Sequence, residues 1–208
     1  MDLIIVGAGG LGREIYSWVS QTIESKNEHT IKGFIDDNLQ ALMNLPYSVK
    51  VLDTISDYTP EINDRFILAI MNPETKKQIS HQLIQKKASF FTFVHPTAII
   101  GTNVTLGKGN IICPYCILTN DIVLGDFVFI NTNSTIGHDS TIGHYTSING
   151  KVEITGNSTI GESCLFGVGA VVIPGRRIDN RVTVGAGSVV IRNIKSDKTV
   201  FGNPAKYI

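Results

Sequence analysis

A histidine and an aspartate stand side by side in a stretch that otherwise repeats a simple pattern. Residues 134–149 read STIGHDSTIGHYTSIN, where His138-Asp139 falls in a six-residue unit that recurs with His144 in the same place. Imidazole titrates near neutrality, so it can take a proton from an attacking group. A neighbouring carboxylate can hold the ring in one tautomer and stabilise the imidazolium. The pair is therefore either a general base with its support or polar filling at a turn.

A glycine-rich loop near the start of the chain is the second candidate site. The stretch GAGGLG places Gly7, Gly9 and Gly12 between a predicted strand and a predicted helix. Such a loop can present backbone N–H groups to a diphosphate. Asp36 lies at about the distance that a dinucleotide-binding unit requires, so NAD is an alternative ligand. The α/β half is short and lacks a second mononucleotide unit, which disfavours NAD.

Two other patterns suggest different chemistry and carry less weight. Cys113 and Cys116 form a CPYC sequence, but redox chemistry needs the first cysteine at a helix N-terminus, and this sequence lies inside a repeat. We interpret both as structural filling. A zinc site on the repeat would need three imidazoles, and only His138 and His144 lie within it, so we expect no metal.

The elements that position the glycine loop alternate between strand and helix. This order predicts a small parallel α/β layer that ends before Pro96. The predicted strands are 2–6, 31–36, 64–70 and 89–94, and the predicted helices are 11–25 and 73–87.

From residue 100 onward an apolar residue recurs every six positions without a gap. This period does not fit an α-helix, whose apolar positions recur every three to four residues, but it suits a short strand followed by a corner. Repeated units of this kind stack into a solenoid. The sixteen positions are Ile100, Leu106, Ile112, Leu118, Leu124, Ile130, Ile136, Ile142, Ile148, Ile154, Ile160, Phe166, Val172, Ile178, Val184 and Val190.

Composition narrows the class of protein. Acidic and basic side chains balance at 18 each, so we expect neither a nucleic-acid nor a membrane partner. Residues 151–208 alone are basic, with 8 Lys and Arg against 4 Asp and Glu. The apolar runs are far shorter than a bilayer span, and three cysteines do not suggest a disulfide framework. These features predict a cytoplasmic protein.

Several motifs in a fixed order resemble one family. GAGGLGRE, the uninterrupted hexads, the His-Asp pair and the final FGNPAKYI are similar to the hexapeptide-repeat sugar O- and N-acyltransferases, in the branch of sialic acid O-acetyltransferases and UDP-4-amino-sugar N-acetyltransferases. The resemblance covers nearly the whole chain. It implies a Rossmann-like α/β domain at 1–94 that binds a sugar nucleotide. It also implies an all-β left-handed parallel β-helix at 95–208, of roughly five coils, with a C-terminal coenzyme A loop.

The resemblance also implies roles at the reacting centre. His138 would be the general base, and Asp139, which stands where the family often has glutamate, would orient its ring. Gly156 lies eighteen residues after His138, and its backbone N–H would stabilise the oxyanion. Asn131 would contact the acceptor sugar.

Two further sets of residues follow from the resemblance. Leu11 and Ser147 stand where relatives carry histidine, and Met71 where they have glycine. The residues expected at the sugar nucleotide are Gly9, Gly10, Leu11, Asp36 and Asp37. The residues expected at coenzyme A are Ser147, Val168, Ala186, Pro204 and Lys206.

The leading hypothesis is an acetyl-CoA-dependent acetyltransferase that acts on an amino- or hydroxy-sugar, with a nucleotide-activated sugar favoured. We expect direct transfer without an acyl-enzyme, and a homotrimer with each active site between two subunits. One alternative is a non-catalytic solenoid that binds a sugar nucleotide or scaffolds an assembly. Another is a metal-dependent lyase of the gamma-carbonic-anhydrase type.

Overall fold

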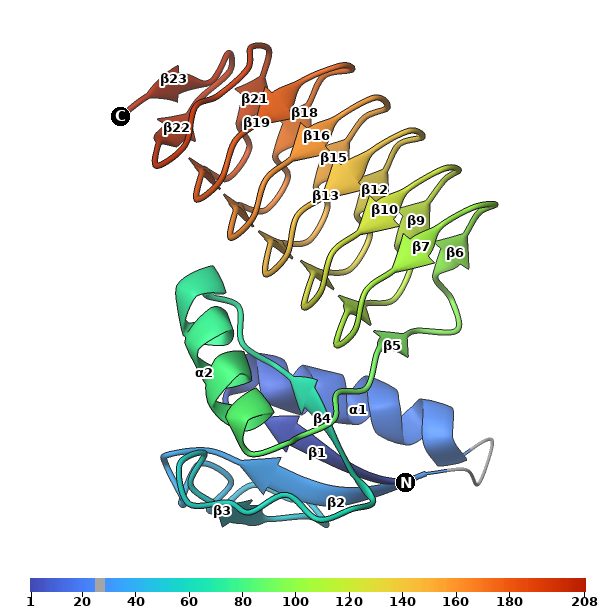
Figure 1. Cartoon of the computed structure of the whole chain (residues 1–208), viewed down its shortest axis with the longest axis vertical. Coiled ribbons are helices and arrows are strands. Elements are labelled where there is room, and N and C mark those ends of the chain that lie inside the picture. Colours follow the sequence, from blue (N-terminus) through green and yellow to red (C-terminus); the bar gives the residue numbers. More distant parts are fainter. Residues whose placement is uncertain (25–28) are drawn as a thin grey trace. The chain divides into compact units, whose positions relative to one another are not determined.

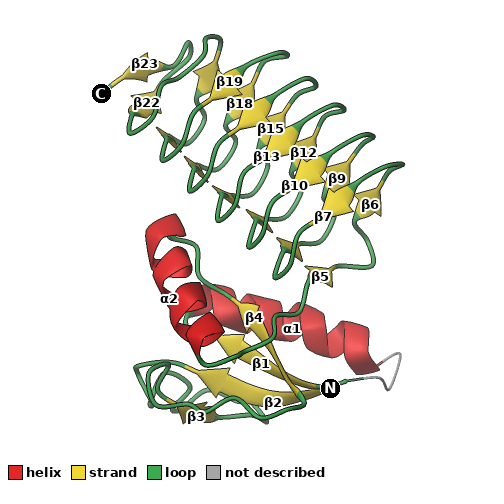
Figure 2. Cartoon of the chain, in the orientation of Figure 1, coloured by secondary structure: helices red, strands yellow, loops and turns green. Residues whose placement is uncertain are grey.

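The computed structural model describes residues 1–24 and 29–208 and divides into two compact units. The first unit comprises residues 1–71 and 75–93, and the second comprises residues 72–74 and 94–208. Figure 1 and Figure 2 show that the helices occur early in the chain and that a stack of short strands makes up the rest. Ser25, the last residue of the first predicted helix, lies outside the described residues.

The first unit is an α/β layer. Its four strands form a parallel sheet in the order β3-β2-β1-β4, and buried apolar residues of β1, β2 and β4 make the core. A parallel sheet with helices in its connections is the arrangement that the strand-helix alternation predicts. The elements are β1 (Asp2–Val6), α1 (Gly10–Glu24), β2 (Thr30–Ile35), β3 (Val51–Asp53), β4 (Asp64–Leu68) and α2 (Pro73–Gln85).

Three details of this unit differ from the prediction. Strand β3 was not predicted, because its three residues have no apolar run around them. Helix α2 stops two residues early, because Lys87 adopts a left-handed conformation (φ 63°) and the N–H of Ala88 turns back to the carbonyl of Leu83. The predicted strand 89–94 is reduced to a single bridge at Phe90 and the two-residue strand β5 (Phe93–Val94).

The second unit is a parallel β-helix with three faces. Face 1 contains β6 (Ile99–Ile100), β9 (Ile117–Leu118), β12 (Thr135–Ile136), β15 (Glu153–Ile154), β18 (Val171–Val172) and β21 (Val189–Val190). Face 2 contains β7 (Thr105–Leu106), β10 (Val123–Leu124), β13 (Thr141–Ile142), β16 (Thr159–Ile160) and β19 (Arg177–Ile178). Face 3 contains β5, β8 (Ile111–Ile112), β11 (Phe129–Ile130), β14 (Ser147–Ile148), β17 (Leu165–Phe166), β20 (Thr183–Val184), β22 (Thr199–Phe201) and β23 (Lys206–Tyr207).

Every strand from β6 to β18 pairs with the strand three places later in the chain, so one coil takes eighteen residues. The sixteen strands β6–β21 therefore make five coils and one further strand, as the hexads predicted. The second residue of each strand points inward, and from Ile112 onward these residues are almost completely buried. Each such burial contributes about 1.5–3 kcal/mol to stability.

The corners between faces depend on one left-handed residue each. This conformation favours Asn, Asp and Gly, which explains the polar and glycine residues that the repeat places there. We call the corner from face 1 to face 2 the 1–2 corner, and name the others likewise. In the 1–2 corner, the left-handed residues are Asn103, Asp121, Asp139, Asn157 and Gly175.

Candidate active site

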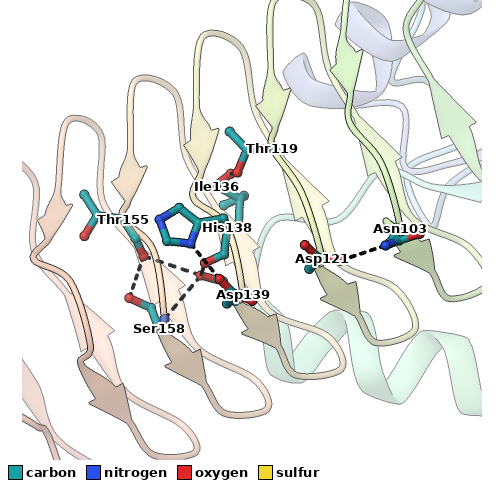
Figure 3. A network of polar contacts seen from close by, with 9 residues as sticks. Asn103, Thr119, Asp121, Ile136, His138, Asp139, Thr155 and Ser158 are labelled. Atoms are coloured by element: carbon teal, nitrogen blue, oxygen red, sulfur yellow. Dashed lines mark hydrogen bonds and ion pairs between the residues drawn. The ribbon is translucent and has the colours of Figure 1, made fainter.

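His138 and Asp139 lie in the 1–2 corner of the third coil, directly after β12. The inward side chain of Ile136 fixes the corner to the core, and the His138 side chain, 59% exposed, points outward. The ring Nδ1 of His138 lies 2.7 Å from Oδ2 of Asp139 (Figure 3). Aspartate is therefore long enough to reach the ring, although it is one methylene shorter than glutamate.

Other corner side chains have a structural task that His138 does not perform. At this position of the hexad, four side chains accept the backbone N–H of the residue eighteen places earlier: Asn120, Asp126, His144 and Asn180. Asn120 accepts from Thr102 at 3.2 Å in this way, and Asn180 accepts from Glu162 at 2.9 Å. The ring of His138 is instead bonded to Asp139, so the pair departs from the ladder of caps that the repeat builds.

His144 occupies the same hexad position in the next corner and performs the structural task. The backbone N–H of Asp126 donates to its Nδ1 at 2.8 Å. An amide can only donate, so this nitrogen is an acceptor and the ring proton of the neutral imidazole sits on Nε2. His144 is therefore an exposed residue with a capping role that the sequence did not reveal.

The hydrogen bond to Asp139 gives His138 the opposite tautomer. An ionised carboxylate can only accept, so the proton of the neutral ring sits on Nδ1 and the lone pair on Nε2. Nε2, the nitrogen that lies against Gly156, is thus the one that can accept a proton. This is the protonation state that a general base needs before reaction.

Gly156 lies against the ring of His138, one coil further along the same corner. A Cβ atom built on Gly156 would fall 2.6 Å from Nε2 of His138, so a larger residue here would force the ring to move. Gly137 is glycine for a related reason, because its own Cβ would fall 2.4 Å from the backbone nitrogen of Gly156. Gly137 cannot be recognised from the sequence alone, since one of many repeated glycines carries no separate signal.

The N–H of Gly156 is available to a ligand. Within the described part of the chain, no hydrogen bond uses this N–H as its donor, whereas the next amide, of Asn157, donates to the carbonyl of His138 at 2.8 Å. A basic ring nitrogen and a free backbone N–H therefore adjoin each other at one corner. Such a pair can take a proton from a nucleophile and stabilise negative charge on a carbonyl oxygen.

The remaining predicted residues of the β-helix lie elsewhere. Asn131 is in the 3–1 corner of the same coil, separated from His138 by strand β12, and its Oδ1 accepts the N–H of Thr132 at 2.8 Å. Ser147 is completely buried in β14. The others predicted for coenzyme A are exposed or partly exposed: Val168, Ala186, Pro204 and Lys206.

The glycine loop of the α/β unit divides into structural and open positions. Gly7 has a left-handed conformation (φ 97°), and a Cβ on Gly12 would fall 1.9 Å from the carbonyl oxygen of Gly7. These two glycines are required by the fold itself. Gly9 and Gly10 are exposed, and no atom lies within 4 Å of a Cβ placed on either, so their surroundings leave room for a ligand.

Asp36 and Asp37 follow strand β2 next to this loop. Both oxygens of Asp36 accept backbone N–H groups, from Ala8 at 2.7 Å and from Asn38 at 2.8 Å. Asp36 therefore joins the glycine loop to the end of β2. Asp37 is more exposed and accepts the N–H of Ile55 at 3.2 Å, and Leu11 is half-buried in the first turn of α1.

The two cysteines of the CPYC sequence have structural positions. Cys113 and Cys116 are buried, and the thiol of Cys116 donates to the carbonyl of Asn131 at 3.1 Å. Burial raises the pKa of Cys116 to about 11. Among the described residues, no group of three or more His, Cys, Asp or Glu side chains is arranged to hold a metal ion. Neither described helix is long and apolar enough to cross a membrane.

Comparisons with known proteins show which proteins this chain is similar to. Residues 2–83 match the family described as the PglD N-terminal domain. GDP-perosamine N-acetyltransferase of Escherichia coli O157:H7 is 27% identical over 211 residues, which cover 97% of this chain and 94% of that protein. The acetyltransferase domain of PglB from Neisseria gonorrhoeae FA1090 has a TM-score of 0.90 at 26% identity, over 100% of this chain and 99% of that one.

A third relative carries ligands. PerB from Caulobacter crescentus, in complex with CoA and GDP-perosamine, has a TM-score of 0.87 at 26% identity, over 100% of this chain and 97% of that one. The β-helix is of the left-handed type, and the similarity to sugar N-acetyltransferases assigns the chain to the acyltransferases. Within that class, the matched N-terminal domain and the similarity to sugar N-acetyltransferases support the hexapeptide-repeat sugar acyltransferase family.

Proposed function

We propose that this protein transfers the acetyl group of acetyl-CoA to the amino group of a nucleotide-activated sugar. The observation that carries the proposal is the pairing of a basic Nε2 on His138 with the free N–H of Gly156. Nitrogen rather than oxygen is favoured as acceptor, because GDP-perosamine N-acetyltransferase is similar over nearly its full length.

The reaction needs no acyl-enzyme. The sugar amine attacks the thioester carbonyl carbon while Nε2 of His138 takes a proton from the amine. Asp139 holds the ring and stabilises the imidazolium, and the N–H of Gly156 donates to the oxyanion. The intermediate collapses as the carbon-sulfur bond breaks, and the imidazolium returns its proton to the departing thiolate of coenzyme A. The N-acetylated sugar and the free thiol are the products.

The α/β unit would hold the nucleotide. Gly9 and Gly10 leave open space at the start of α1, where backbone N–H groups and the helix dipole favour a diphosphate. Asp37 has the more exposed carboxylate of the acidic pair and is the better candidate for a direct contact with the nucleoside. Asn131 would contact the acceptor sugar.

Coenzyme A would lie along the exposed residues Val168, Ala186, Pro204 and Lys206, whereas Ser147 is completely buried in this chain. The excess of Lys and Arg after residue 150 suits a ligand that carries several phosphates. We also propose a homotrimer, because face 1 carries the exposed apolar side chains of Ile99 and Ile117. A cytoplasmic location follows from these substrates.

The test is thiol release from acetyl-CoA with UDP-4-amino sugars, GDP-4-amino sugars and free sialic acid as acceptors. We expect one amino sugar to drive release, and His138→Ala to lower the rate by on the order of a hundredfold or more. His144→Ala is the matched control, since the two residues share a hexad position. Equal rates in native protein and His138→Ala would refute the proposed base. Light scattering should give a mass three times 22.6 kDa.

A further inference from the structure

One carbonyl in the active-site corner accepts a hydrogen bond from a buried hydroxyl and lies near a second, that of Ser140, which is equally close to the carbonyl of His138 at 3.4 Å. The carbonyl oxygen of Thr155 lies 2.7 Å from Oγ of Ser158 and 3.4 Å from Oγ of Ser140. Both serines are about 1% exposed and occupy the interior of the 1–2 corner in successive coils. Figure 3 shows Thr155 and Ser158 beside the ring of His138. Of the two contacts, the shorter one to Ser158 is the stronger hydrogen bond.

This carbonyl belongs to the same peptide group as the N–H of Gly156. The carbonyl and the N–H of a trans peptide point in opposite directions. Because buried hydroxyls hold the Thr155 carbonyl from inside the coil, the N–H of Gly156 is directed outward, where the ring of His138 lies. A hydrogen bond to the carbonyl also polarises the peptide and strengthens its N–H as a donor.

We propose that Ser158, assisted by Ser140, is a positioning residue for acyl transfer. Its hydroxyl fixes the orientation of the Thr155–Gly156 peptide and strengthens the N–H that receives the developing oxyanion. The proposal rests on the proposed acetyltransferase function. It adds a buried residue that touches neither substrate and acts only through the peptide group.

The chain itself supplies a graded series of replacements for Ser158. Thr146 fills the equivalent interior place in the 2–3 corner and donates to the carbonyl of Gly161 at 2.9 Å. Cys164 fills the same place one coil later, and its thiol donates to the backbone carbonyl of Asp179 at 3.2 Å. Threonine, cysteine and alanine at 158 therefore fit the fold while offering a hydroxyl donor, a weak thiol donor and no donor.

The matched control is Ser134→Ala. Ser134 occupies the same interior place in the 3–1 corner, where its hydroxyl donates to the carbonyl of Asn149 at 2.9 Å. It lies away from the His138 corner, so its loss removes a comparable buried hydrogen bond without touching the Gly156 peptide. The hydroxyl of Ser134 also accepts the N–H of Val152 at 3.2 Å, so the melting temperature should fall at least as far in Ser134→Ala as in Ser158→Ala.

The experiment measures kcat and KM for acetyl-CoA and the amino sugar in all variants. We expect kcat to fall about tenfold in Ser158→Ala, less in Ser158→Cys and little in Ser158→Thr, with KM values within about twofold, since the N–H acts mainly in the transition state. Ser134→Ala should keep the native kcat. Equal kcat values in Ser158→Ala and Ser134→Ala, or a change in KM alone, would overturn the proposal.

A second readout does not depend on activity. The amide nitrogen resonance of Gly156 should move in Ser158→Ala and stay in place in Ser134→Ala, because only the first loses a hydrogen bond to that peptide. An unmoved resonance would overturn the proposal. If no amino sugar drove thiol release in the native protein, the proposed function would fail, and the Gly156 resonance would then decide whether Ser158 holds the peptide.

Discussion

His138 and His144 occupy the same position in successive hexads, but their neutral rings carry the proton on opposite nitrogens. Nδ1 of His138 donates to Asp139, whereas Nδ1 of His144 accepts the N–H of Asp126. One ring therefore presents a basic Nε2 to solvent and the other caps a coil. A repeated sequence thus assigns two tasks to one residue type, and the immediate hydrogen-bond partner decides which.

Asp139→Asn should remove most of the activity without unfolding the protein. The left-handed position tolerates asparagine, as Asn103 and Asn157 show in the same corner. An asparagine amide can donate to Nδ1 and force the proton onto Nε2, so we expect kcat to fall by about a hundredfold or more. Asp121→Asn, one coil earlier, is the control and should keep native activity. A fully active Asp139→Asn enzyme would mean that the carboxylate does not set the tautomer.

Gly156→Ala should displace the ring of His138, because the added Cβ would lie 2.6 Å from Nε2. We expect at least a hundredfold loss of kcat with the β-helix intact. Gly150→Ala is the control, since Gly150 holds the same hexad position and its nearest neighbour would lie 3.3 Å away. Circular dichroism and thiol release should be recorded on both. Similar activity in the two variants would contradict the close approach.

Gly9→Ala should fold normally and bind the nucleotide sugar less tightly. The added methyl meets no protein atom within 4 Å, so only a ligand can collide with it. We expect KM for the sugar nucleotide to rise about tenfold, which corresponds to about 1.4 kcal/mol of binding free energy. Gly12→Ala should instead destabilise the α/β unit, because its methyl overlaps the carbonyl of Gly7. An unchanged KM in Gly9→Ala would place the nucleotide elsewhere.

The three cysteines should resist alkylation in the folded protein. All are buried, and burial raises the pKa of Cys116 and of Cys164 to about 11, so few thiolates exist at pH 8. Intact mass after iodoacetamide treatment should show no adduct in native protein and three in guanidinium chloride. Rapid native labelling would show that a coil containing these residues opens readily.

Lys76 should make the stability of the protein depend on pH. Burial lowers its pKa to about 7, whereas the unfolded chain has the ordinary value near 10.4. Below pH 7 the folded state therefore bears the full cost of burying a charged ammonium group. Between about pH 7 and 10 only the unfolded chain keeps the proton, so the free energy of unfolding rises with pH. Lys76→Met should raise the melting temperature at pH 6, with the difference shrinking towards pH 10. Parallel pH profiles would mean that Lys76 stays charged.

Periodicity explains why much of the β-helix could be predicted. The position of every inward residue follows from a six-residue period, and the place of His138 follows from the same count. Contacts between coils could not be predicted, because they join residues eighteen positions apart and depend on side-chain rotamers. The hydrogen bond from the N–H of Asp126 to the ring of His144 is of this kind. Strand β3 was missed because three residues are too few to show a period.

The position of the corner site within the stack has a consequence for partial unfolding. His138 belongs to the third of five coils and Gly156 to the fourth, so complete coils flank both on each side. A solenoid is nearly one-dimensional, and its ends fray before its middle. Exchange of backbone amide hydrogens with solvent should therefore be fastest in the first and last coils and slowest in the coils that carry His138 and Gly156. The reacting groups therefore lie in the part of the β-helix that opens last on heating.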